Sequence, residues 1–134
     1  MGGMQRTKGV RGELEVVHKL ESKGVMARRT AQRMGKSGDA ADVVLDGSDL
    51  HVEVKRCERL QWKATIAQVV RDSRGKPWII VHRPNGAEWL VIQTLDNWLA
   101  DSREAERARQ HRDSVIESAL AAIRAQAHGD AVSD

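Results

Sequence analysis

Two short runs of β-forming residues, joined by a turn signal, constrain the fold of this 134-residue chain more than any other feature. The first run, 40–45, holds Asp42 among alanines, valines and a leucine, and the second, 50–55, alternates apolar and polar residues with period two. Residues 46–49, Asp-Gly-Ser-Asp, separate the runs and are typical of a turn. We therefore predict an antiparallel hairpin that brings Asp42 alongside Glu53.

Asp42, Glu53 and Lys55 are the candidate catalytic residues of this hairpin. Glu53 and Lys55 are two residues apart on one strand, so their side chains share a face. Two carboxylates held close together repel each other, and a divalent cation relieves that repulsion. Such a cation suits phosphodiester hydrolysis, because it polarises the phosphoryl group and lowers the pKa of a bound water that Lys55 would orient. A simpler interpretation is an ion pair between Glu53 and Lys55 on an exposed strand.

A third acid lies upstream on an expected helix. Residues 8–20 carry apolar side chains at helical spacing, namely Val10, Leu14, Val17 and Leu20. Glu13 flanks this stripe. We expect it to lean from the helix edge toward the hairpin and to supply another ligand.

These residues resemble the archaeal-type Holliday junction resolvases, which belong to the PD-(D/E)xK nuclease superfamily. The resemblance covers about residues 6–60 and rests on an ordered set of matches: Lys8-Gly9, Glu13, Lys23-Gly24-Val25, Arg28-Arg29, Asp42 and Glu53-x-Lys55. It implies a restriction-endonuclease-like α/β core and a Mg²⁺-dependent homodimer, with Mn²⁺ as a substitute, that cuts four-way DNA junctions by paired nicks. Residues 32–39 predict a longer loop than is usual in the family, and Ala41 stands where the superfamily name expects proline.

The resemblance also implies roles for particular residues. It implies a metal site built from acidic side chains and one main-chain carbonyl: Glu13, Asp42, Glu53 and Val54. Lys55 would be the catalytic lysine. Arg29 matches a basic strand residue of the family, and Ser37 matches a loop serine.

Charge is unevenly distributed along the chain. Residues 1–92 hold 17 Lys and Arg against 11 Asp and Glu, a balance of +6, whereas residues 93–134 hold 5 against 8, a balance of −3. An acidic metal site repels nucleic acid unless nearby cations compensate. The predicted DNA-binding residues surround the motif in sequence: Lys8, Arg11, Arg28, Arg29, Arg33, Lys36, Ser37, Arg56, Arg59 and Lys63.

The length and composition fit one domain in a reducing compartment. We expect a nuclease core over 1–100, a helical extension over 101–128 and a disordered tail over 129–134. A single cysteine, Cys57, forms no internal disulfide, and the chain lacks an apolar run of membrane-spanning length or a signal peptide. We therefore expect a cytoplasmic protein.

The central part of the chain predicts a mixed central β-sheet flanked by helices, with the acids along one edge. A helix is expected over 62–72, followed by strands over 78–82 and 88–92. Gln68 on that helix is expected to be solvated, although the resemblance also allows a position against the active site. His51, two residues before Glu53, is expected on the surface, with a place in the lining of the pocket as the alternative. Two interpretations of Trp62 stay open, base stacking and core packing. The other tryptophans are expected to fill the core, because the chain has no Phe or Tyr: Trp78, Trp89 and Trp98.

Helix-favouring residues dominate from Thr94 onward. We expect a short helix capped by Thr94 and a second helix starting near Asp101. Residues 103–113 are highly charged. A later apolar stripe should pack on the domain or on a partner subunit: Val115, Ile116, Ala119, Leu120 and Ile123.

Two other functions remain open at this point. A related nuclease of repair or restriction would act on duplex or flapped DNA, because substrate choice depends on loops and dimer geometry. A non-catalytic nucleic-acid-binding module would carry the same carboxylates as structural groups and would bind DNA without metal.

Overall fold

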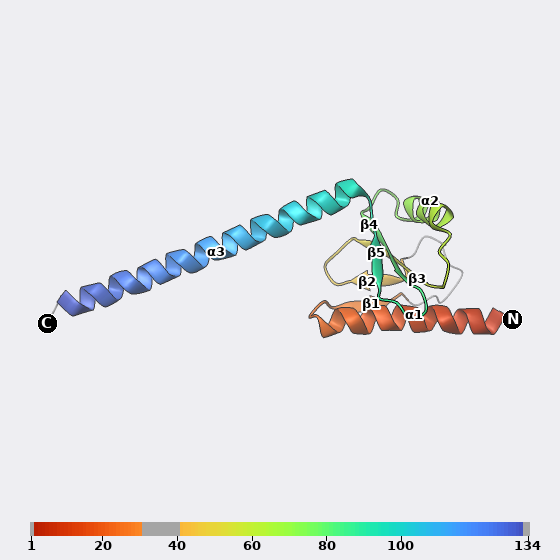
Figure 1. The fold of residues 1–134 in the computed structure, drawn as a ribbon, viewed down its shortest axis with the longest axis horizontal. Helices are drawn as coiled ribbons and strands as arrows, with labels where there is room; N and C mark the ends of the chain where they lie inside the picture. The colour runs from red at the N-terminus through yellow and green to blue at the C-terminus, as the bar shows by residue number, and fades with distance from the viewer. Residues whose placement is uncertain (1, 31–40, 133–134) are drawn as a thin grey trace. The chain divides into compact units, whose positions relative to one another are not determined.

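A computed structural model of the chain describes residues 2–30 and 41–132, and it divides the chain into two compact units, Met1–Gln93 and Thr94–Asp134. The elements follow in the order α1 (Gly2–Ser22), β1 (Ala27–Arg29), β2 (Val43–Leu45), β3 (His51–Arg56), α2 (Trp62–Asp72), β4 (Trp78–Arg83), β5 (Leu90–Ile92) and α3 (Leu95–Val132) (Figure 1). The predicted α/β class and the order of elements up to β5 are confirmed.

The five strands form one mixed sheet with the spatial order β1-β2-β3-β4-β5. β3 pairs antiparallel with β2 and parallel with β4, which it reaches through the crossover helix α2. β3 is therefore the central strand, and the expectation that the acids lie along one edge of the sheet is wrong for Glu53. Pairing on both sides explains the burial of the strand, whose first four residues are all buried.

Each face of the sheet carries its own hydrophobic cluster. Val16 and Val17 of α1 pack on Val52 and Val54 of β3. On the opposite face, Val69 of α2 packs on Trp78 and Ile80 of β4. Because side chains alternate along a strand, Glu53 lies on the face covered by α2.

The predicted hairpin between β2 and β3 is confirmed. The strands pair antiparallel with Val43 opposite Val52, and these two valines are almost completely buried, at 0% and 1% exposure. The turn contains Gly47 at φ 72°, a left-handed conformation that glycine adopts without strain. The hairpin therefore fixes the residue before β2, Asp42, relative to the middle of β3.

Gly12 allows α1 to approach β3 closely. A Cβ atom at this position would lie 2.7 Å from the Arg56 Cβ, which is attached directly to the backbone and cannot swing away. A Cβ at Gly9 would meet nothing within 4 Å. Substitutions of Gly12 and Gly9 by alanine therefore provide a matched test of how closely α1 packs on β3.

We expect Gly12→Ala to lower the free energy of unfolding by about 1–3 kcal/mol, because the added methyl overpacks the α1–β3 contact. Gly9→Ala should raise it by up to about 1 kcal/mol, because alanine favours helix more than glycine does. Urea denaturation of both variants measures the difference. Equal stabilisation by the two substitutions would contradict the close packing of Gly12 against β3.

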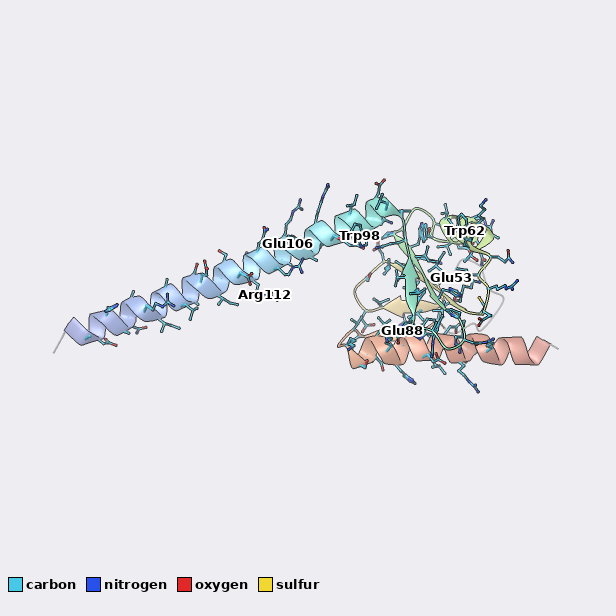
Figure 2. All side chains as sticks on the ribbon, in the orientation of Figure 1. Glu53, Trp62, Glu88, Trp98, Glu106 and Arg112 are labelled. Atoms are coloured by element: carbon cyan, nitrogen blue, oxygen red, sulfur yellow. The ribbon has the colours of Figure 1, made fainter. Side chains whose placement is uncertain are left out.

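The second unit is one long helix, α3, and not the two helices expected from the sequence. Thr94 Oγ1 accepts a hydrogen bond from the Asn97 N–H, as expected for a cap. The charged stretch 103–113 continues the helix because it pairs charges along its own surface, with Glu106 accepting from Arg109 and Gln110. Glu106 and Arg112 project from this stretch in Figure 2.

The expected tail over 129–134 is wrong for its first residues, since α3 continues through Gly129 to Val132; residues 133–134 lie outside the described part. The apolar stripe of α3 is about half exposed, and Trp98 on the same helix is 53% exposed, so α3 by itself does not bury Trp98 and its core role stays a prediction. Trp78 is buried and Trp89 packs against the α1-side cluster, as expected. Among the described helices, none has the length and apolarity needed to cross a membrane.

Candidate active site

Asp42 is held at the start of β2 by hydrogen bonds to both neighbouring strands. Its N–H donates to the Val52 carbonyl at 2.9 Å, and its carbonyl accepts from the Thr30 N–H at 3.0 Å. Its carboxylate Oδ2 accepts from the Val54 N–H at 2.8 Å. The backbone and the side chain of Asp42 are therefore both fixed beside Glu53.

Three polar side chains follow one another on the α2-side face of β3. Glu53 is in the middle, and its Oε1 lies 3.5 Å from Lys55 Nζ. Its Oε2 lies 3.7 Å from His51 Nε2. Glu53 is only 6% exposed, and Figure 2 places it inside the first unit, so the simpler interpretation of an exposed ion pair is not supported.

The carboxylates of Asp42 and Glu53 are electrostatically coupled. The pKa of Asp42 is raised from 3.8 to about 7, first by burial and next by the charge of Glu53, although the Val54 N–H opposes the shift. The pKa of Glu53 is also raised, chiefly by burial, while Lys55 lowers it. Two acids that repel each other in a buried place are a suitable pair of ligands for a divalent cation.

Glu13 lies on α1, and the structure pairs it with a residue predicted to bind DNA. Its Oε2 accepts a short hydrogen bond from Arg29 Nε, and Glu13 is 8% exposed. Its charge nevertheless contributes to the raised pKa of both Asp42 and Glu53. Glu13 is therefore near the centre, but its carboxylate is held by Arg29.

The donor atoms at this centre fit Mg²⁺, which commonly takes one or two carboxylates and completes its shell with water. Val54 offers a further oxygen. Its N–H points toward Asp42, and in a strand the N–H and C=O of one residue point the same way, so the Val54 carbonyl is directed to the same side. Within residues 2–30 and 41–132, no three His, Cys, Asp or Glu side chains are grouped closely enough to hold a metal by themselves. Asp42, Glu53 and the Val54 carbonyl are thus the residues that would hold the cation.

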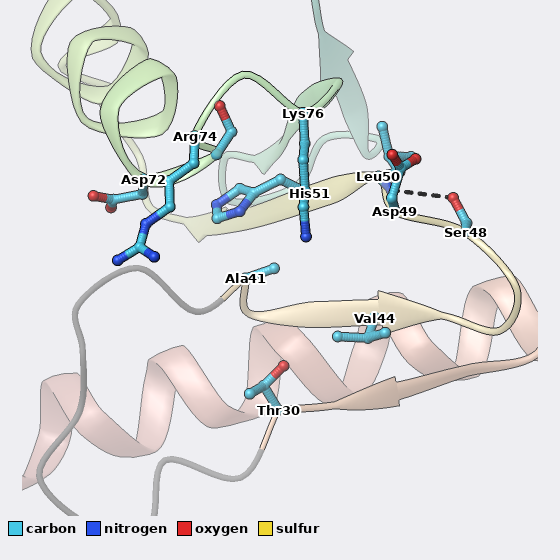
Figure 3. Close-up of a pocket in the computed structure, with 11 residues that line it drawn as sticks. Thr30, Ala41, Val44, Ser48, Asp49, Leu50, His51, Asp72, Arg74 and Lys76 are labelled. Carbon is cyan, nitrogen blue, oxygen red and sulfur yellow. Dashed lines mark hydrogen bonds between the residues drawn. The ribbon is translucent and has the colours of Figure 1, made fainter.

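A pocket of about 360 Å³ is lined by two residues that bear on the predicted site, His51 and Asp72. His51 is 5% exposed, so the expectation of a solvated histidine is wrong. Asp72, at the end of α2, also lines the pocket, and its charge raises the pKa of Glu53. Figure 3 shows His51 projecting from β3 into the space below the segment that carries Asp72 and Lys76. The alternative interpretation from the sequence, that His51 lines a pocket because it lies two residues before Glu53, agrees with the structure, whereas nothing local marks Asp72.

The predicted DNA-binding residues fall into three groups. Exposed cations on the first unit are available to phosphates: Lys8, Arg11, Arg28, Arg59 and Lys63. Arg29 and Arg56 are instead engaged within the protein, Arg29 with Glu13 and Arg56 with Asn85 Oδ1 at 2.9 Å. Arg33, Lys36 and Ser37 lie outside the described residues.

α2 presents an aromatic side chain to solvent. Trp62 is 56% exposed, and Lys63 Nζ lies 5.4 Å from the centre of its ring. An exposed indole paired with a cation suits base stacking better than core packing. Gln68 is half-buried, and the described contacts do not connect it to the acids.

No protein-family model matches the sequence, and no curated protein gives a significant sequence match. The structure is similar to that of Hjc, a Holliday junction resolvase from the hyperthermophilic archaeon Archaeoglobus fulgidus. The TM-score is 0.50 and the identity 23%, over 63% of this chain and 76% of that one. The similarity shows that the mixed five-stranded sheet with its helices has the restriction-endonuclease-like fold.

Proposed function

We propose that this protein is a Mg²⁺-dependent endonuclease that hydrolyses phosphodiester bonds of four-way DNA junctions by paired nicks, with Mn²⁺ as a substitute cation. The observation that carries the proposal is the position of Asp42, Glu53 and Lys55 at one place on the sheet of a resolvase-like fold. Two coupled acids beside an ammonium group, with Glu53 buried and Asp42 half-buried, have no evident structural purpose, since removing carboxylates from water costs stability.

Each residue has a distinct role in this proposal. Asp42, Glu53 and the Val54 carbonyl bind the cation, and Glu13 completes the site through water while Arg29 holds its carboxylate. The bound cation supplies Lewis-acid activation of the phosphoryl group and of a water. Lys55, at 3.5 Å from Glu53, positions the attacking water and offsets the charge that develops on the phosphoryl oxygens.

A homodimer accounts for paired nicks. Two centres related by a two-fold axis would cut opposing strands of a junction that is itself nearly two-fold symmetric. Selectivity for the junction would come from its shape and deformability, because a branch point opens where a duplex resists bending. Exposed cations such as Arg11 and Arg28 would track the phosphates around the acidic centre.

The proposal is tested by incubating the full chain with an end-labelled four-way junction, a flapped duplex and a linear duplex of matching sequence, each with Mg²⁺ and with EDTA. Paired Mg²⁺-dependent nicks near the branch point, with the duplex left intact, are the expected result. Equal cutting of all three substrates would assign a general nuclease instead. Binding without cutting in Mg²⁺ would assign the non-catalytic module.

Trp62 is expected to contribute to DNA binding through its exposed ring. Trp62→Ala should weaken binding to junctions roughly 5- to 150-fold, since stacking of one base on an aromatic side chain contributes about 1–3 kcal/mol. Fluorescence anisotropy in Ca²⁺ measures the affinity without cleavage. Val70→Ala, a change at an exposed apolar residue of the same helix, should bind like the wild type; an equal loss in both variants would point to a damaged α2 and not to stacking.

A further inference from the structure

His51 has an unusual environment for a buried histidine. Its side chain is almost fully enclosed, and its Nε2 has no hydrogen-bond partner among the described residues. A buried polar atom without a partner costs about 1–3 kcal/mol. Such an atom is rare in native proteins and is a reason to look for a role that the ligand-free protein does not display.

The acceptor in reach of His51 Nε2 is a carboxylate of the candidate metal centre. Glu53 Oε2 lies 3.7 Å away, and an approach by about 0.7 Å would give an ordinary N–H···O hydrogen bond. The other oxygen of Glu53, Oε1, faces Lys55 Nζ at 3.5 Å. His51 and Lys55 therefore flank Glu53 from the two sides along the same face of β3.

We propose that His51 is a positioning residue of the metal centre, and that its Nε2–H donates to Glu53 Oε2 when the cation is bound and holds that carboxylate in the orientation that binds it. This inference rests on the proposed function, because it assumes that Glu53 is a ligand. Hydrogen-bond partners of ligating groups fix the orientation of the ligands, and their loss typically lowers metal affinity 10- to 100-fold.

The pocket around His51 is consistent with this role. Asp72 lines the same pocket as His51, and its charge acts on both His51 and Glu53. The Asp72 side chain is itself only 9% exposed. Thr30 Oγ1, on the opposite wall of the pocket, is a second buried atom without a partner among the described residues (Figure 3). The pocket thus holds two buried polar atoms, His51 Nε2 and Thr30 Oγ1, that have no hydrogen-bond partner among the described residues.

The test compares two substitutions of nearly equal shape, His51→Gln and His51→Met. Glutamine carries an N–H donor about where the imidazole Nε2 lies, whereas methionine fills the same space without a donor. Binding of Mn²⁺ alone is measured by isothermal titration calorimetry in the absence of DNA. We expect His51→Met to raise the dissociation constant 10- to 100-fold and His51→Gln to stay within about threefold of the wild type. His18→Leu, on the exposed surface of α1, serves as a control and should change nothing.

The outcomes separate this inference from the proposed function. Equal dissociation constants for wild type, His51→Gln and His51→Met would overturn the positioning role even if the wild type cleaves junctions. An equal loss of Mn²⁺ affinity in His51→Gln and His51→Met would also overturn the positioning role, because the N–H donor that glutamine keeps would then make no difference. If Mn²⁺ affinity follows the expected pattern but the wild type cuts no DNA, the positioning role stands and the nuclease proposal fails.

Discussion

Glu53→Gln is expected to lower Mg²⁺-dependent cleavage of a four-way junction by at least about 10²- to 10³-fold, while binding to the junction is kept. The substitution preserves the size of a side chain that is 6% exposed, but it removes the negative charge that would bind the cation. Asp42→Asn should have a loss of similar size. Single-turnover cleavage rates at saturating protein measure both effects without interference from affinity.

The same cleavage assay ranks the other residues of the centre by how much rate is lost when each is substituted. Glu13→Gln should cost less, roughly tenfold, because Arg29 holds the Glu13 carboxylate away from direct coordination. The Asp42→Asn, Glu53→Gln double variant should be little worse than either single variant, since residues that act as one unit are not additive. Asp46→Asn, in the exposed turn of the hairpin, is the matched control and should cleave at the wild-type rate. Wild-type activity in all three single variants would contradict the proposed site.

Asp42→Asn is also expected to stabilise the metal-free protein at pH 8, by up to about 4 kcal/mol. The pKa of Asp42 rises from 3.8 to about 7 on folding, so the native state holds this proton more tightly than the unfolded state does. The contribution of that proton to stability is fully present below about pH 4 and is lost as the pH rises through 7. Asparagine has no proton to lose and can still accept the hydrogen bond from the Val54 N–H.

The measurement is the free energy of unfolding in urea with EDTA, for both proteins, from pH 4 to pH 8. The advantage of Asp42→Asn should be small at pH 4, grow as the pH rises, and become constant above about pH 8. Saturating Mg²⁺ at pH 8 should reverse the order, because the cation stabilises the wild type by mass action. A metal-free Asp42→Asn protein that is less stable than the wild type at pH 8 would show that the Asp42 carboxylate is not in a repulsive, buried environment.

The local features of the fold followed from the sequence because they depend on neighbouring residues. Alternation in 50–55 and the turn at 46–49 predicted the hairpin, and the same alternation placed Glu53 and Lys55 on one face. The position of β3 at the centre of the sheet could not be predicted in this way, since it depends on the parallel pairing with β4 through α2. Without that position, the sequence favoured a surface place for His51 over a place in the lining of the pocket, whereas the central strand buries it.

Long-range partners explain the remaining differences at the site. Arg29 was expected to contact DNA, but its partner Glu13 lies 16 residues earlier on α1, and only the packing of α1 on the sheet brings the two together. Asp72 joins the site from the end of α2 for the same reason. Trp98 was expected in the core because the chain lacks other aromatic residues, but composition alone does not determine which tryptophan is buried, so that role stays a prediction.

The central claim is that Asp42 and Glu53 bind the catalytic cation, and the most direct test is to locate Mn²⁺ by anomalous diffraction in crystals of the full chain. The expected result is a peak about 2.1 Å from a carboxylate oxygen of Asp42, a carboxylate oxygen of Glu53 and the Val54 carbonyl. Crystals of Asp42→Asn should lack this peak under the same conditions. A saturating Mn²⁺ soak that leaves the position between Asp42 and Glu53 empty, or that gives the same peak in Asp42→Asn, would contradict the account.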